Sequence, residues 1–84
     1  MAPDLGSVVA RNVRAERGRR GWRQEDLAEK LGWDRSSVGH LETGRRKITV
    51  GDLPLLCRVF GIELDVLFYG ADAADRRAMG MPRT

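Results

Sequence analysis

The chain has 84 residues, enough for one domain with a modest hydrophobic core, and its 15 basic and 12 acidic residues give a net charge of +3. A single cysteine, Cys57, excludes an internal disulfide framework, and no apolar run is long enough to form a transmembrane helix. Because residues 1–4 do not lead from a basic segment into an apolar one, no signal peptide is predicted, and we expect a soluble cytoplasmic protein without a membrane partner.

The basic residues are concentrated in the first half of the chain. Residues 11–47 contain eleven Arg or Lys and six Asp or Glu, a net charge of +5, whereas residues 48–84 carry a net charge of −1. This asymmetry favours a polyanionic partner for the first half. A solvated arginine-rich surface explains the charge distribution about as well, so charge alone does not decide between them.

Two short helices are predicted at residues 4–17 and 24–31, where apolar residues recur every three or four positions. Their inner faces carry Val9, Val13, Leu27, Ala28 and Leu31. Glu16 is expected to face outward with its arginine neighbours. Arg23 stands at the start of the second helix, where Ser or Thr would cap better, and Gly32 permits the turn that follows.

Residues 34–44 are predicted to form a third helix with two different faces. Asp34 can cap its start through the carboxylate, and Gly44 can adopt the left-handed conformation that ends a helix. Val38 and Leu41 supply the inner face. The outer face holds only polar or small residues, namely Arg35, Ser36, Gly39, His40 and Thr43. An outer face without apolar cover, in so small a domain, predicts a polar partner.

Two further helices and a tail complete the predicted architecture. Residues 51–60 begin beside a weak capping box from Thr49 to Asp52, and residues 62–68 form a fifth helix with Leu64, Leu67 and Phe68 inward. From residue 70 the chain is small and polar, which predicts a frayed helical turn followed by a disordered end. The predicted fold class is therefore all-α, a compact bundle of five short helices, with a domain at residues 1–69 and a C-terminal tail at residues 70–84.

Residues 24–43 have the spacing of a helix-turn-helix. Ala28 stands where two helices would cross, because only a small side chain allows close approach there, and Gly32 makes the turn. On these residues the sequence resembles the Xre family of phage-repressor and Cro-like (lambda-repressor-like) proteins, over about residues 5–68. The segments that carry the resemblance are 13–17, 24–32, 37–38, 41–46 and 60–62. The resemblance implies a five-helix bundle whose third helix enters the DNA major groove, and a twofold dimer on an inverted-repeat operator.

The resemblance also implies a role for each matching residue. Base edges would be contacted by Arg35, Ser36, Gly39 and His40. Phosphates would be contacted by Arg23, Gln24, Thr43, Arg45, Arg46 and Lys47. Arg17 and Glu42 match the family's ion pair, which ties the first helix to the end of the third.

The same reading predicts where two copies would meet. Leu64 and Leu67 can serve the core, so Val66, Phe68 and Tyr69 are the candidates for a dimer interface. The basic face would then remain free for DNA.

No catalytic constellation is visible, and His40 has no partner at metal-ligand spacing, so we expect no enzyme activity, no metal and no cofactor. The leading hypothesis is a sequence-specific DNA-binding transcriptional regulator. The alternatives are an antitoxin that binds a protein toxin and autoregulates its operon, and an interaction module that has lost DNA binding. The basic flank and Arg35 argue against the last of these.

Overall fold

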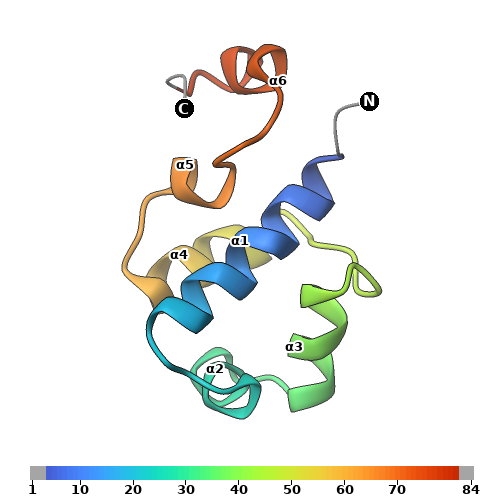
Figure 1. Ribbon diagram of the computed structural model, residues 1–84, viewed down its shortest axis with the longest axis vertical. Helices are drawn as coiled ribbons and strands as arrows, with labels where there is room; N and C mark the ends of the chain where they lie inside the picture. Colours follow the sequence, from blue (N-terminus) through green and yellow to red (C-terminus); the bar gives the residue numbers. More distant parts are fainter. Residues whose placement is uncertain (1–3, 82–84) are drawn as a thin grey trace.

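The computed structural model describes residues 4–81, which form six α-helices and no strand (Figure 1). The helices are α1 (Leu5–Arg19), α2 (Gln24–Leu31), α3 (Arg35–Glu42), α4 (Asp52–Phe60), α5 (Leu64–Leu67) and α6 (Ala73–Ala78). The prediction of an all-α bundle containing a helix-turn-helix is confirmed, with α2 and α3 as its two helices, while the number of helices is one more than the five expected. None of the helices within the described part of the chain is long and apolar enough to cross a membrane.

The core lies where the inner faces of α1 to α5 meet. Helix α1 runs through the middle of the bundle, with α2 and α3 at one end and α6 at the other (Figure 1). The buried apolar residues that pack together in this core are Val8, Val9, Val13, Leu27, Ala28, Leu31, Val38, Leu41, Leu56, Phe60, Leu67, Phe68 and Ala71. Most of these helices have only four to nine residues, too few to be stable alone in water. Their order therefore depends on this shared core.

Carboxylates near helix starts satisfy backbone groups that have no partner inside the helix. Asp4 accepts a hydrogen bond of 2.9 Å from the Ser7 N–H at the start of α1, and this bond lowers the pKa of Asp4. At the start of α2, Asp26 accepts a 2.8 Å hydrogen bond from the Arg23 N–H, which likewise lowers the pKa of Asp26. The acid one turn into α2 thus supplies a cap contact beside a residue that is itself a poor cap.

The start of α3 differs from the prediction. Asp34 occupies the cap position, but its carboxylate accepts no capping hydrogen bond. The backbone carbonyl of Asp34 instead accepts the Ser37 N–H at 3.0 Å. The predicted capping box at α4 is present, because the Thr49 N–H donates to Asp52 Oδ2 at 3.0 Å and the Asp52 N–H donates to Thr49 Oγ1 at 3.3 Å.

Helix α6 stands where a frayed helical turn was expected. Arg76, only 2 % exposed, donates from Nη1 to the carbonyl oxygen of Phe68 at 2.8 Å and to that of Asp65 at 3.5 Å. Asp65 lies inside α5 and Phe68 directly follows it, so the Arg76 side chain attaches α6 to the end of α5. The Met81 N–H closes α6 by donating to the Arg76 carbonyl at 2.8 Å. Residues 82–84 of the expected tail lie outside the described residues.

The side chains of α5 and of the turn after it meet some expectations and correct others. The helix covers only Leu64–Leu67, so Leu64 begins it and lies exposed, although the sequence predicted that it faces inward. Phe68 is 6 % exposed and packs in the core, which confirms its predicted inward position and makes it unsuitable as a dimer contact. Of the three candidates for the dimer interface, Val66 in α5 and Tyr69 after it remain at the surface.

Candidate nucleic-acid interface

Helix α3 is attached to the bundle by one face and exposes the other. Val38 and Leu41 are fully buried, whereas Arg35, Ser36 and His40 are exposed. The outer face of α3 carries no apolar side chain. Its exposed side chains differ in length, and each carries a hydrogen-bond donor. This is the surface that the sequence predicted to meet a polar partner.

The end of α3 is fixed to α1 by a two-point ion pair. Arg17 donates from Nε to Glu42 Oε2 at 2.6 Å and from Nη2 to Glu42 Oε1 at 3.0 Å. The Glu42 side chain is 3 % exposed and that of Arg17 is 17 % exposed, and the hydrogen bond to Glu42 raises the pKa of Arg17. Arg17 also donates from Nη1 to the Trp22 carbonyl at 2.8 Å. One guanidinium thus joins α1, the turn after α1 and the last turn of α3.

A second hydrogen bond brings the start of α2 into the same network. Gln24 Nε2 donates to Glu42 Oε1 at 3.2 Å, a contact that the sequence did not reveal. Gly39 faces this side chain, because a Cβ placed on Gly39 would lie 3.7 Å from Gln24 Oε1. Gly39 therefore lies where α3 passes close to the first residue of α2.

The exposed arginines around α3 have only loose partners within the protein. Arg35 Nε lies 3.9 Å from Glu25 Oε1, and Arg23 Nε lies 3.6 Å from Asp26 Oδ2. Surface pairs of this kind contribute about 0–1 kcal/mol and are screened by salt. Both guanidinium groups can therefore exchange their partner for a phosphate or a base edge. Thr43 differs, because its hydroxyl donates to the Gly39 carbonyl of its own helix at 3.0 Å.

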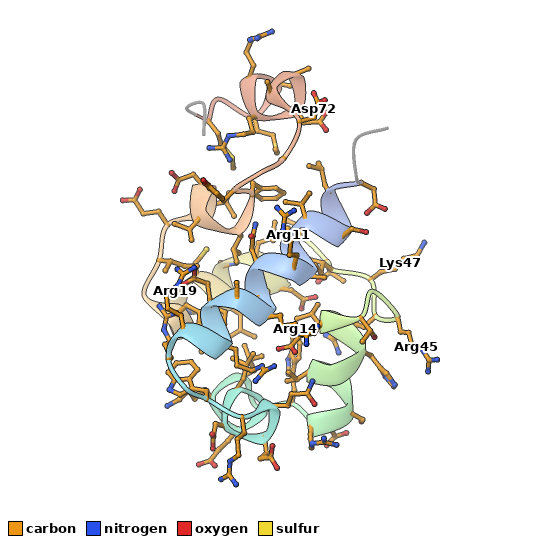
Figure 2. The ribbon with its side chains drawn as sticks, viewed as in Figure 1. Arg11, Arg14, Arg19, Arg45, Lys47 and Asp72 are labelled. Atoms are coloured by element: carbon orange, nitrogen blue, oxygen red, sulfur yellow. The ribbon has the colours of Figure 1, made fainter. Side chains whose placement is uncertain are left out.

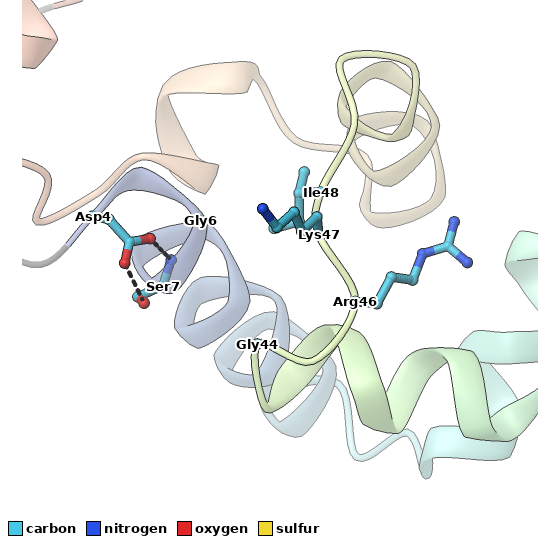
Figure 3. A pocket seen from close by; sticks show the side chains of 7 residues that line it. All are labelled: Asp4, Gly6, Ser7, Gly44, Arg46, Lys47 and Ile48. Carbon is cyan, nitrogen blue, oxygen red and sulfur yellow. Dashed lines mark hydrogen bonds between the residues drawn. The ribbon is translucent and has the colours of Figure 1, made fainter.

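The loop after α3 sends its basic side chains in different directions. Arg45 and Lys47 are exposed and project from the side of the bundle that carries α3 (Figure 2). Lys47 extends toward the start of α1, whereas Arg46 leaves the loop in another direction (Figure 3). A hollow of about 430 Å³ separates this loop from the first turn of α1; it is lined by Asp4, Gly6, Ser7, Gly44, Arg46, Lys47 and Ile48.

Arg46 is turned toward the protein. Its guanidinium carbon lies 3.8 Å from the centre of the Trp33 ring, and Nη2 lies 3.5 Å from Asp52 Oδ1. Of the six residues expected to contact phosphate, Arg46 thus has the most extensive side-chain contacts within the protein, while Arg23, Arg45 and Lys47 extend into solvent.

The remaining candidates for the dimer interface lie in α5 and in the turn that follows it, away from α3. Tyr69 is 57 % exposed and Val66 is half-buried. Both border a hollow of about 420 Å³ between α1 and α5, together with Asn12, Glu16, Arg19 and Asp65. The described residues hold no group of three or more His, Cys, Asp or Glu arranged to bind a metal ion.

Comparison with known proteins places this arrangement among regulators. A family model described as helix-turn-helix matches residues 13–67. A hypothetical transcription factor from Neisseria meningitidis is 36% identical over 59 residues, which are 70% of this chain but only 56% of that protein. The crystal structure of the Neisseria hypothetical transcription factor NHTF superposes with a TM-score of 0.74 and 29% identity, covering 94% of this chain and 92% of that one.

Two restriction–modification controller proteins share the same fold. C.AhdI from Aeromonas hydrophila is 34% identical with a TM-score of 0.68, covering 74% of this chain and 94% of that chain. C.Esp1396I, solved as a tetramer in complex with its natural 35 base-pair operator, is 30% identical with a TM-score of 0.69, covering 79% of this chain and 87% of that chain.

Proposed function

Because the chain belongs to the Cro/C1-type helix-turn-helix family, we propose that it is a sequence-specific DNA-binding transcriptional regulator, acting in the cytoplasm, whose helix α3 enters the major groove. The observation that carries the proposal is the two-sided character of α3. Its inner face is buried and bound to α1 through Glu42, and its outer face presents Arg35, Ser36 and His40 to solvent. The solved relatives include a hypothetical transcription factor and restriction–modification controllers, so they favour a regulator over an antitoxin.

The proposed DNA contacts are of two kinds, contacts to base edges and contacts to phosphates. Arg35, at the first position of α3, can make a bidentate contact to guanine, with Ser36 and His40 beside it and Gly39 allowing close approach. Arg23, Arg45 and Lys47 surround this helix and would neutralise phosphates. Gln24, at the first position of α2, would offer its backbone N–H to a phosphate, because its side-chain amide is held by Glu42.

The proposal predicts DNA binding that depends on both sequence and salt. Fluorescence anisotropy with the inverted repeat nearest the gene should show tight binding that weakens steeply as salt is raised, because each neutralised phosphate contributes about −0.9 to the slope of log K against log salt. Arg35→Ala should lose roughly 1–3 kcal/mol of discrimination at one base pair and keep most of its affinity for unrelated DNA.

Arg45→Ala is the matched control, because it should weaken binding to all sequences alike and flatten the salt slope by about one unit. If the two variants lose affinity alike across a panel of altered operators, the division into base-edge contacts and phosphate contacts is wrong. Salt-independent binding without sequence preference would refute the regulator itself.

The proposed partner arrangement is a homodimer on DNA. One recognition helix reads only a few base pairs, and two copies must place their α3 helices about 34 Å apart to meet successive major grooves. Val66 and Tyr69 are the proposed contacts, since a meeting through α5 leaves α3 and its basic loop free. Sedimentation with operator should give two protomers per inverted repeat, and Tyr69→Asp should reduce this occupancy without lowering Tm. A single protomer per repeat at saturation would contradict the dimer.

A further inference from the structure

The Arg46 side chain contacts other side chains of the protein, whereas its two basic neighbours, Arg45 and Lys47, are exposed. Its guanidinium lies over the face of Trp33 at 3.8 Å, and its side chain is 35 % exposed. A guanidinium this close to an indole ring is held by a cation–π contact and by stacking of two flat groups. On another side of the guanidinium, Nη2 lies 3.5 Å from Asp52 Oδ1.

The two partners of Arg46 come from the two ends of the segment that carries the basic loop. Trp33 lies in the turn between α2 and α3, and its N–H donates to the Ala28 carbonyl at 2.9 Å to close α2. Asp52 is the first residue of α4, is buried, and already binds Thr49 through its capping box. Because the Arg46 side chain contacts both residues, it connects the turn of the helix-turn-helix to the start of α4.

We propose that Arg46 is a positioning residue for DNA binding: it braces the loop between α3 and α4 against the helix-turn-helix turn, and thereby holds Arg45 and Lys47 in register with the phosphates. This assignment replaces the phosphate contact that the sequence implied for Arg46. It rests on the proposed function for its effect on DNA, whereas its effect on the fold can be measured without DNA.

Thermal unfolding tests the brace itself. Arg46→Ala removes the contact with Trp33 and leaves the buried Asp52 carboxylate without its cation, so Tm should fall by about 4–8 °C. Arg46→Lys should lower Tm by a smaller amount, because the ammonium keeps a positive charge beside Asp52 but cannot stack on Trp33 as a planar group. Arg45→Ala, next to it and exposed, should leave Tm unchanged. Wild-type Tm values for both Arg46 variants would overturn the proposal.

Binding to the operator, measured well below every Tm, separates positioning from a direct contact and from a purely structural role. Arg46→Ala should weaken binding on the order of tenfold, and adding Arg45→Ala to it should cost little more, because Arg45 has already lost its position. The double variant should have the same salt slope as Arg46→Ala alone, because the phosphate contacts of Arg45 and Lys47 are already lost in that variant.

Two other results would each overturn the proposal. If Arg46 contacts phosphate, the two losses add, the double variant has a salt slope about one unit flatter than that of Arg46→Ala, and Arg46→Lys binds like wild type. If Arg46 only stabilises the fold, Tm falls but the affinity of the folded variant does not change. If the wild-type protein instead binds no operator while Tm still falls in the Arg46 variants, the proposed function and the positioning role are both refuted. The structural contact of Arg46 with Trp33 and Asp52 would remain.

Discussion

Glu42→Ala is expected to lower the free energy of unfolding by roughly 3–5 kcal/mol and to abolish DNA binding. The Glu42 carboxylate is almost fully buried and receives two hydrogen bonds from Arg17 and one from Gln24. Removing it leaves the mostly buried guanidinium of Arg17 without its anion, in a place that water reaches poorly. Urea unfolding followed by circular dichroism measures the change.

Two control variants test whether the loss of stability depends on the burial of the Glu42 carboxylate. Glu25→Ala removes an exposed glutamate whose nearest cation lies 3.9 Å away, so it should change stability by less than about 1 kcal/mol. The double variant Arg17→Met with Glu42→Leu removes both charges and should recover much of the stability, since an apolar pair of similar volume often replaces a buried ion pair without loss. A Glu42→Ala protein that unfolds like wild type would show that the pair contributes nothing to the fold.

Arg76→Ala is expected to cost about 1.5–3 kcal/mol, because it removes the buried guanidinium that donates to the carbonyls of Asp65 and Phe68. The loss should be felt first in α6, whose attachment to the bundle centres on this residue. Hydrogen exchange should show faster exchange of the α6 amides, including the Met81 N–H that closes the helix. Arg77→Ala, which alters the exposed neighbour, should leave both stability and exchange unchanged.

The helix-turn-helix and its inner face were predictable because they depend on local rules. Val38 and Leu41 are spaced for one helical face, Gly32 ends α2 in the left-handed conformation, and Thr49 with Asp52 forms the expected box. Each of these signals lies within a few residues along the chain. Periodicity of apolar residues is therefore enough to place the α3 helix and to tell its two faces apart.

Three of the corrections share one cause, which is that charged side chains found partners far along the chain or on the backbone. Arg76 binds carbonyls of α5, and Arg46 lies against Trp33. Glu16 was expected to face outward, yet it is buried beside Arg20, which also donates to the Phe60 carbonyl at 2.7 Å. Apolar spacing counts such residues as surface and gives no indication of the partner that allows their burial.

The residues that hold α3 in place and the residues that would read DNA do not overlap. Val38, Leu41 and Glu42 make the attachments, while Arg35 and its exposed neighbours on the outer face take no part in the core. Mutations on the outer face are therefore nearly neutral for folding, and selection can act on them through the target sequence alone. After a gene duplication, one copy could acquire a new operator through a few such changes, without passing through an unstable intermediate.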